Sequence, residues 1–336
     1  MKRLPKIDLH RHLEGSLRVE TLTELVRTEH LDLPVDEASL RALAQISPGD
    51  PRGSQTFLSK FEFLRQFYRS PEIVERTVRE AVADAAADGV RYLELRFTPV
   101  ALAQARQYPL GDVFEWVIEA STAEARDRGI KVGLIASVNR QEPIKTAEQV
   151  ARLAADRRGA IRGLDLAGNE VEFPADPFRQ VFAAAKQDGL GITIHAGEWS
   201  GPAAVRQAIE SLGADRIGHG VRTLEDPRLV ALARERRTVF EVCLTSNLHS
   251  GAVLNASGHP LPRMLEAGLQ TIIGTDDPGI SGITLSDEFL LAVELLDLSM
   301  ESLKGLTLAA AQAAFLSRRE KAMLEEELQQ AFFGDG

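Results

Sequence analysis

Two histidines stand two residues apart near the start of the sequence, in KIDLHRHLEGSL, residues 6–17. They follow an apolar lead that favours a β-strand. Because side chains alternate along a strand, His10 and His12 are expected to point to the same face. Two imidazoles on one rigid strand are well placed to bind one metal ion. The pair alone is also compatible with buried structural histidines, so further ligands must come from elsewhere in the chain.

More residues with metal-binding or acid–base side chains follow later apolar runs. His195 and Glu198 end GITIHAGE, His219 ends DRIGHG, and Asp276 and Asp277 end QTIIGTDD. Three histidines and one aspartate suit a borderline divalent ion such as zinc, with a further position left for water. A bound ion lowers the pKa of that water towards ~7, which supplies hydroxide at neutral pH.

The expected ligands are His10, His12, His195 and Asp276. A bridged pair of ions would need an extra anionic ligand, often a modified lysine on a middle strand. The lysine available there, Lys131, stands at the wrong end of its run. The sequence therefore favours a single ion and leaves His219 free for catalysis.

These residues must be positioned by the elements that precede them. The β-like runs are 6–12, 90–97, 131–138, 161–168, 191–197, 215–220, 238–245 and 270–277. Helical segments such as 77–89 lie between them, and in 176–189 Asp176 is expected to cap a helix whose first residue is Pro177. Eight strands alternating with helices predict an α/β protein with one (β/α)8 TIM barrel. The carboxyl ends of its strands meet at one rim, so the polar residues are predicted to converge there.

The region 14–76, after the first strand, is too long for one crossover helix and is expected to hold extra inserted helices. Its aromatic stripe consists of Phe57, Phe61, Leu64, Phe67 and Tyr68. Such a stripe packs a helix against the barrel, and part of it can also form a lid over an apolar substrate. We see no linker or repeat, so residues 1–336 are interpreted as a single domain.

The composition excludes several classes of partner. The 336 residues carry 39 Lys and Arg against 49 Asp and Glu, a net charge of −10, which disfavours nucleic acid and anionic membranes. The single cysteine, Cys243, fits a reducing compartment. Residues 1–5 are too short for a signal peptide and no apolar run reaches ~18 residues, so we expect a cytoplasmic protein with a small-molecule partner. The oligomeric state stays open.

The motifs HRHLEGSL, DLAGNE, HAGE, RIGHG, TSN and GTDDP, in this order between residues 10 and 280, resemble the adenosine deaminase family. This family belongs to the metal-dependent amidohydrolase superfamily. The resemblance implies a (β/α)8 barrel and one zinc ion per chain. It also implies hydrolytic removal of the purine 6-amino group, which converts adenosine or 2′-deoxyadenosine to the inosine product and ammonia in purine salvage.

The resemblance also implies roles for single residues. His10, His12, His195 and Asp276 resemble the zinc ligands. Glu198 resembles the acid that protonates purine N1, so it must be protonated at neutral pH, which requires a desolvated pocket. His219 resembles the residue that orients or deprotonates the metal-bound water. Asp277 resembles the group that meets N7, and the backbone N–H of Gly168 resembles the N3 donor.

The sequence departs from the family pattern at the sugar end of the site. Glu14 stands where adenosine-using members usually have Asp, and in the family this acid faces the ribose. HLEG also resembles members that act on free adenine or on other N9 substituents, whereas DLAG favours adenosine. Leu244 replaces a common proline, and His249 is interpreted as a loop residue without function. Adenosine is the main predicted substrate. The alternative substrate is adenine or another 6-aminopurine derivative, such as a 5′-modified adenosine or an aminofutalosine-type compound.

Other polar residues have structural interpretations beside functional ones. Asp165 either organises the metal site or forms an ion pair, and Ser246 and Asn247 are expected to support the end of the seventh strand. Glu94 and Arg96 are expected to form a buried ion pair with each other. A catalytically inactive binding relative would lack a ligand or the Glu/His pair, and none is missing. An esterase or lactonase is disfavoured because the acids in HAGE and GTDDP suit contacts with the nitrogens of a purine ring.

Overall fold

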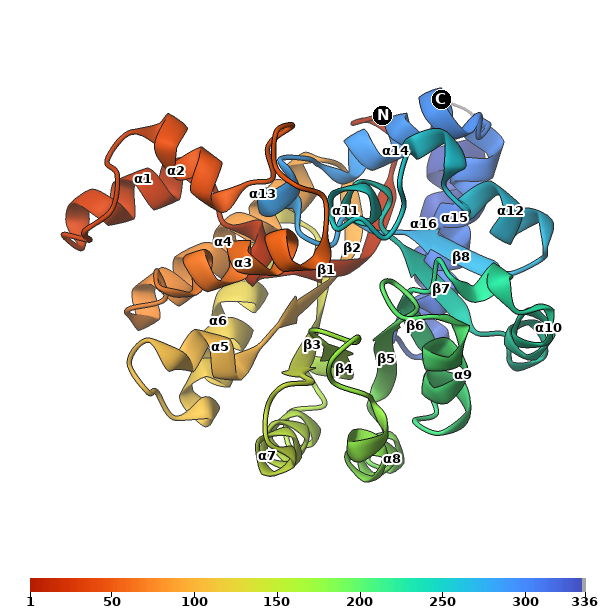
Figure 1. Ribbon diagram of the computed structural model, residues 1–336, viewed down its shortest axis with the longest axis horizontal. Coiled ribbons are helices and arrows are strands. Elements are labelled where there is room, and N and C mark those ends of the chain that lie inside the picture. The colour runs from red at the N-terminus through yellow and green to blue at the C-terminus, as the bar shows by residue number, and fades with distance from the viewer. Residues whose placement is uncertain (334–336) are drawn as a thin grey trace.

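The computed structural model describes residues 1–333, and within them eight parallel strands form one sheet in sequence order. The strands are β1 (Lys6–His12), β2 (Val90–Phe97), β3 (Lys131–Asn139), β4 (Ile161–Ala167), β5 (Gly191–Ala196), β6 (Arg216–His219), β7 (Val239–Val242) and β8 (Gln270–Ile273). A parallel bridge between Arg11 and Asp276 brings the two edges together. The predicted (β/α)8 TIM barrel is confirmed (Figure 1).

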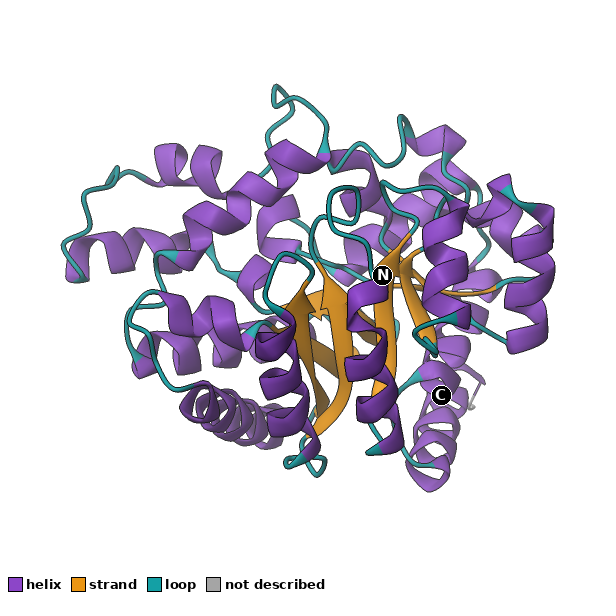
Figure 2. Cartoon of the chain, turned by 60° about the horizontal axis from the view of Figure 1, so that its bottom comes forward, coloured by secondary structure: helices purple, strands orange, loops and turns teal. Residues whose placement is uncertain are grey.

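Helices surround the strands on the outside, so the sheet is enclosed (Figure 2). The α-helices are α1 (Val19–Thr28), α2 (Glu37–Ala44), α3 (Ser54–Arg65), α4 (Pro71–Ala87), α5 (Pro99–Gln104), α6 (Leu110–Arg128), α7 (Ile144–Ala155), α8 (Arg179–Gln187), α9 (Pro202–Glu210), α10 (Pro227–Arg236), α11 (Leu244–His249), α12 (Leu261–Glu266), α13 (Pro278–Ser281), α14 (Leu285–Leu296), α15 (Met300–Ala313) and α16 (Arg318–Phe333). Short 3₁₀ helices are η1 (Glu14–Ser16), η2 (Asp176–Phe178), η3 (Thr223–Glu225) and η4 (Ala256–Gly258). Within residues 1–333, no helix combines the length and the apolar character needed to cross a bilayer.

The predicted helical insertion between β1 and β2 is present as η1, α1, α2 and α3, followed by α4 (Figure 1). The aromatic stripe has two uses. Phe67 and Tyr68, in the turn after α3, are buried in the core, whereas Phe57 and Phe61 line a pocket at the rim of the barrel. The stripe therefore both packs the insertion and lines the pocket.

Local boundaries differ from the prediction in three places. The seventh and eighth strands end at Val242 and Ile273, earlier than expected, because α11 begins at Leu244 and the chain turns towards the site after β8. Asp176 belongs to the 3₁₀ helix η2 and gives no helix-capping hydrogen bond, so that predicted cap is wrong. The helix expected at 77–89 begins earlier, where Ser70 accepts a hydrogen bond from the Ile73 N–H.

The inside of the barrel contains charged side chains that pair across it. Nη2 of Arg216 lies 2.5 Å from Oε2 of Glu94, and Nε of Arg216 lies 2.6 Å from Oε1 of Glu241. Arg96 forms an ion pair with Glu241 as well. The predicted Glu94–Arg96 pair is therefore wrong, because each of these residues on β2 reaches a partner on another strand.

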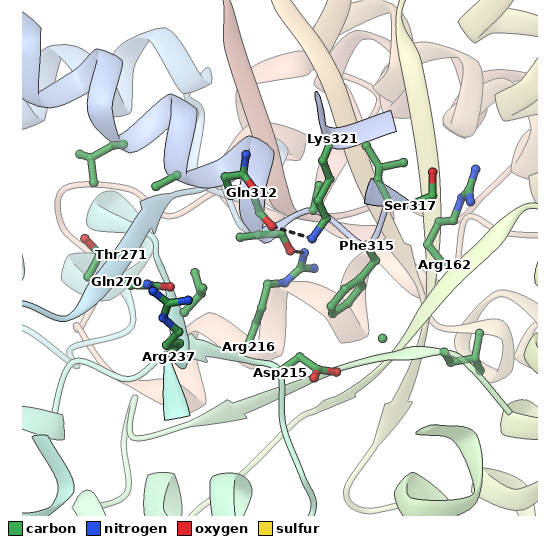
Figure 3. Close-up of a pocket in the computed structure, with 18 of the residues that line it drawn as sticks. Arg162, Asp215, Arg216, Arg237, Gln270, Thr271, Gln312, Phe315, Ser317 and Lys321 are labelled. Atoms are coloured by element: carbon green, nitrogen blue, oxygen red, sulfur yellow. Dashed lines mark hydrogen bonds between the residues drawn. The ribbon is translucent and has the colours of Figure 1, made fainter. Parts of the chain in front are cut away.

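A cavity of about 1130 Å³ lies where the amino ends of several strands face α15 and the start of α16 (Figure 3). Lys321 donates a hydrogen bond of 2.6 Å to the Gln312 carbonyl, and Arg216 donates one of 3.0 Å to the Ala313 carbonyl. Both carbonyls are at the carboxyl end of α15, where cations are stabilised by the helix dipole. The ring of Phe315 lies 3.7 Å from the Arg216 guanidinium and covers Gly191. This end of the barrel is therefore closed by paired charges and an aromatic side chain.

Candidate metal and catalytic site

The four predicted ligands converge at the opposite end, beside the carboxyl ends of the strands. Nε2 of His10 and Nε2 of His12 lie 3.1 and 3.3 Å from Oδ1 of Asp276. Nε2 of His12 also lies 3.3 Å from Nε2 of His195. Donors around a tetrahedral ion with bonds of about 2.0–2.2 Å are separated by roughly 3.3 Å, so this spacing fits a zinc-sized ion. Although Nε2 of His10 is buried and lies 3.1 Å from Oδ1 of Asp276, it makes no hydrogen bond of good geometry among residues 1–333, as expected of an atom that binds a ligand.

The backbone holds Asp276 directly against β1. Its N–H donates a hydrogen bond of 2.7 Å to the His10 carbonyl, and its carbonyl accepts one of 2.8 Å from the His12 N–H. Asp276 has a φ of +59° and His219 a φ of +63°. Residues with side chains rarely adopt this left-handed conformation, and it occurs at functional sites where the surrounding structure enforces it.

Two buried carboxylates orient two of the histidines. Oε2 of Glu241 lies 2.8 Å from Nδ1 of His10, and Oδ1 of Asp165 lies 3.0 Å from Nδ1 of His195. Each contact leaves Nε2 of the histidine facing the cluster, which is the usual arrangement behind metal-binding histidines. Asp165 also accepts a hydrogen bond of 2.9 Å from Ser137, so it is part of the site's supporting network. Sequence reasoning missed Glu241, whose signal was a single acid within the apolar strand VFEV.

His12 is in the protonation state that a metal ligand requires. Burial lowers the pKa of its imidazole to about 3. The ring is therefore neutral at physiological pH, with a lone pair available for coordination.

His219 lies beside the predicted ligands as well as beside the predicted acid. Its Nε2 is 3.5 Å from Oε2 of Glu198 and 3.8 Å from Oδ2 of Asp276. In the described part of the chain, two groups have ligand atoms close enough to share an ion. These groups are His10, His195, His219 and Asp276, and His12, Asp165 and His195. His219 therefore lies close enough to the other side chains to be either a metal ligand or a catalytic residue. Its hydrogen bonds distinguish these two roles.

Glu198 is buried at this centre and contacts one hydroxyl group. Ser250 donates a hydrogen bond of 2.8 Å to its Oε1. Burial, assisted by the nearby charge of Asp276, raises the pKa of the Glu198 carboxyl well above its usual range. A raised pKa favours the protonated carboxyl, which is the form in which Glu198 could act as an acid.

A pocket of about 380 Å³ opens onto these residues. Its apolar lining includes Phe57, Phe61 and Trp199, which suit the faces of a planar ring. Gly168 also lines it with a φ of +95°, and a Cβ at this position would lie 2.6 Å from the Gln141 side chain. A glycine is therefore required here, and its backbone is open to a ligand.

Two acids in the same pocket have oxygens without partners. Glu14 accepts a hydrogen bond of 2.6 Å from the Thr98 N–H through Oε1, but its buried Oε2 has no partner within residues 1–333. Oδ1 of Asp277 is in the same situation. Burial raises the pKa of both carboxyls. Both residues line the pocket, and unpartnered polar atoms beside a pocket are candidates for contacts with a ligand.

Residues from the TSN motif lie in the site instead of only supporting a strand. Ser246 and Asn247 are on α11, and Ser246 donates a hydrogen bond of 2.6 Å to Oδ2 of Asp276. Nδ2 of Asn247 lies 3.1 Å from Nδ1 of His219. His249 is at the end of the same helix and belongs to neither metal-binding group.

Comparisons with known proteins agree with this geometry. The profile of the family "Adenosine deaminase" matches residues 5–331. An adenosine deaminase of Serratia proteamaculans is 39% identical over 328 residues, which cover 97% of this chain and 98% of the relative. An adenine deaminase from Arthrobacter aurescens superposes with a TM-score of 0.90 at 28% identity, covering 97% of this chain and 98% of its own. An amidohydrolase from Burkholderia ambifaria with bound Zn superposes with a TM-score of 0.88 at 26% identity, covering 98% and 92%.

The match spans nearly the whole chain, and the motifs that led to the resemblance are those that meet at the barrel rim. The fold and chemistry of these relatives are those of hydrolases acting on C–N bonds. The chain belongs to the adenosine deaminase family.

Proposed function

We propose that the chain deaminates adenosine and 2′-deoxyadenosine to inosine and 2′-deoxyinosine, with release of ammonia, as a cytoplasmic enzyme of purine salvage. The observation that carries this proposal is the buried Glu198 carboxyl, whose pKa is raised, on the same pocket as His219, His12, His195 and Asp276. His10 contacts Asp276 at this site. The single cysteine supports a cytoplasmic location. The identity of the relatives supports the reaction.

The proposed metal ligands are His10, His12, His195 and Asp276, and the proposed cofactor is one Zn²⁺ per chain. When bound, the ion would act as a Lewis acid and lower the pKa of a water molecule at neutral pH. The donor spacing and the relative solved with Zn support this choice. Glu241 and Asp165 would keep the histidine rings oriented whether or not substrate is present.

The remaining residues act on the purine. An aromatic C–NH₂ group resists attack until a ring nitrogen accepts a proton, and Glu198 is proposed to deliver that proton to N1. Asp277 is proposed to contact N7, and the backbone N–H of Gly168 to contact N3. Contacts to several edges of the ring favour a 6-aminopurine over analogues that lack these partners, because unmatched polar groups in a closed pocket are costly.

Glu14 is proposed to meet the sugar. Glu14 lines the same pocket as Asp277, and its Oε2 is unpartnered among the described residues, so hydroxyl groups of a ribose would satisfy it. This contact favours a nucleoside over free adenine, which has no hydroxyl to offer.

A second candidate substrate is an adenosine with an acidic group attached at the 5′ end. Arg65 on α3 lines the catalytic pocket and a neighbouring hollow of about 440 Å³, so the two spaces meet at this side chain. Within residues 1–333, its buried Nε has no hydrogen-bond partner. A guanidinium of this kind suits a carboxylate or phosphate. The solvent-exposed Glu62 on the same rim opposes such an anion, so adenosine remains the main proposal.

The test is ammonia release by zinc-loaded protein on adenosine, 2′-deoxyadenosine, adenine and AMP. Highest kcat/KM on adenosine or 2′-deoxyadenosine supports the main proposal, and highest kcat/KM on AMP supports the second candidate. In the second case Arg65→Gln should lower the AMP preference by about tenfold or more, the loss of one charged contact. Arg69→Gln, in the loop between α3 and α4 and outside both spaces, should leave it unchanged. Highest activity on adenine would contradict the role of Glu14.

A further inference from the structure

His259 is a buried histidine that the catalytic roles above do not use. It follows η4 and has apolar neighbours on α11 and α14. Burial lowers its pKa to about 4, so the ring is neutral at physiological pH. A neutral imidazole carries one N–H and one lone pair, and its hydrogen bonds show which nitrogen has the proton.

The backbone decides the tautomer of His259. The Leu261 N–H donates a hydrogen bond of 3.2 Å to Nδ1 of His259. A backbone N–H can only donate, so Nδ1 must be the acceptor and the proton must be on Nε2. That Nε2 lies 3.4 Å from Oδ1 of Asn247 and therefore donates to it.

The same logic passes through Asn247. Because its Oδ1 receives the His259 proton, its Nδ2 must face the other way, towards His219. Nδ2 lies 3.1 Å from Nδ1 of His219. An amide NH₂ can only donate, so Nδ1 of His219 is an acceptor and the proton of a neutral His219 is on Nε2.

We propose that His259 is a positioning residue: through Asn247 it fixes His219 as the Nε2–H tautomer in the resting enzyme. Nε2 is the nitrogen that faces Glu198 and Asp276. His219 then presents a donor, and no lone pair, to the reacting groups. Of the two roles that the family resemblance left open, orienting and deprotonating, the relay selects the orienting role for the resting state.

The relay is buried along its whole length, which keeps water from offering alternative partners. Side chains of His219, Asn247 and His259 have relative exposures of 1%, 0% and 4%. Every hydrogen bond in the relay has a fixed donor and acceptor, because the first donor is a backbone N–H and this group cannot accept a hydrogen bond. Removing the first link therefore leaves the Asn247 amide free to turn over.

Two substitutions at residue 259 separate the relay from local packing. His259→Asn places an amide oxygen where Nδ1 was, so it can keep the Leu261 contact, but it is too short to reach Asn247. His259→Gln places an amide N–H where Nε2 was and can restore the donor to Asn247. We expect kcat on the best substrate to fall by about 10- to 100-fold in His259→Asn, the usual cost of losing a supporting contact. KM should change little, and His259→Gln should recover most of the loss.

The decisive readout is the tautomer itself, measured by ¹⁵N NMR of histidine-labelled, zinc-loaded protein, with the His219 signals identified by their loss in His219→Gln. The expected result is a proton on Nε2 of His219 in the wild type. Asn247→Asp offers only acceptors, so it should move the proton to Nδ1.

A proton on Nδ1 of wild-type His219 would overturn the inference. So would unchanged kcat and an unchanged tautomer in His259→Asn. The inference relies on the proposed function only for its kinetic test. A protein that fails to deaminate any tested purine would still show the tautomer, so the two failures are distinguishable.

Discussion

The two ends of the barrel contain similar polar and charged side chains, but the ends differ in whether these side chains have partners within the protein. At the amino ends of the strands, Arg216 is bound by Glu94, Glu241 and the Ala313 carbonyl, and Lys321 is bound by the Gln312 carbonyl. At the carboxyl ends, His10, Glu14 and Asp277 each keep a buried polar atom without a partner among the described residues. At the amino ends the charged groups are paired within the protein, and at the carboxyl ends these polar atoms are available to a ligand.

The comparison shows that cavity size does not locate the chemistry. The cavity at the amino ends is about 1130 Å³ and the catalytic pocket about 380 Å³. The larger space is lined by cations that cap a helix or pair with carboxylates, whereas the smaller one contains the histidine cluster. Substitutions at the carboxyl ends should therefore change metal binding and catalysis, and those at the amino ends should change stability.

The largest effect is expected for His12→Ala. It removes a donor from the cluster, so bound zinc should fall and turnover should drop by at least about 10³-fold, or about 4 kcal/mol of transition-state stabilisation. Metal content and ammonia release measure the two effects. His249→Ala, which touches neither metal-binding group, is the control and should keep both. A fully zinc-loaded, active His12→Ala protein would refute the ligand assignment.

Glu198→Gln should lower kcat by about 10²- to 10⁴-fold, the range for loss of a positioned acid. The amide has nearly the same shape but cannot deliver the proton. Zinc content should stay at the wild-type level because Glu198 is not a proposed ligand. Steady-state kinetics with parallel metal analysis distinguishes this result from general damage, and unchanged turnover would exclude the N1 role.

At the other end, Arg216→Met should destabilise the fold by about 3–5 kcal/mol, because Glu94 would remain buried without its cation and Glu241 would keep only one of its two arginines, Arg96. Urea unfolding followed by circular dichroism measures the loss. Arg236→Met, at an exposed position on α10, is the matched control and should stay within about 0.5 kcal/mol of the wild type. Equal stability of the two variants would show that the barrel does not depend on these pairs.

A smaller loss, about 1–3 kcal/mol, is expected for Gly191→Ala, whose new Cβ would overlap the ring of Phe315. Thermal unfolding measures this effect, and kcat below the transition should be retained. Gly191→Ala combined with Phe315→Ala should recover part of the stability that Gly191→Ala costs, because the Cγ and ring atoms that the new Cβ would meet are then absent. Failure to recover would place the cause in the backbone rather than in this contact.

The sequence predicted the barrel and the convergence of the histidines with Asp276 because both depend on features that recur along the chain. Apolar runs end in His195, His219 and Asp276, and strand order then brings the ends together without knowledge of any side-chain contact. The last two strands were predicted too long because CLT and GTDD continue the composition of a strand while the backbone already turns into the site.

The supporting contacts were not predictable in this way. Glu241 meets His10 across 231 residues, and the partners of Glu94 and Arg96 are on other strands. Spacing along one strand identifies residues on the same face but not the residue opposite them. His259 gave no signal because its role depends on which atom of Asn247 it meets.

The seam between β1 and Asp276 has a consequence for the growing chain. His10 and His12 are made first, yet the backbone groups that hold Asp276 against them join only when residue 276 arrives. During synthesis, the proposed coordination sphere of His10 and His12 can therefore close only after most of the protein has been made. A ribosome-bound fragment that ends before β8 would present at most three of the four proposed donors, so tight metal binding at the proposed site would indicate a completed barrel.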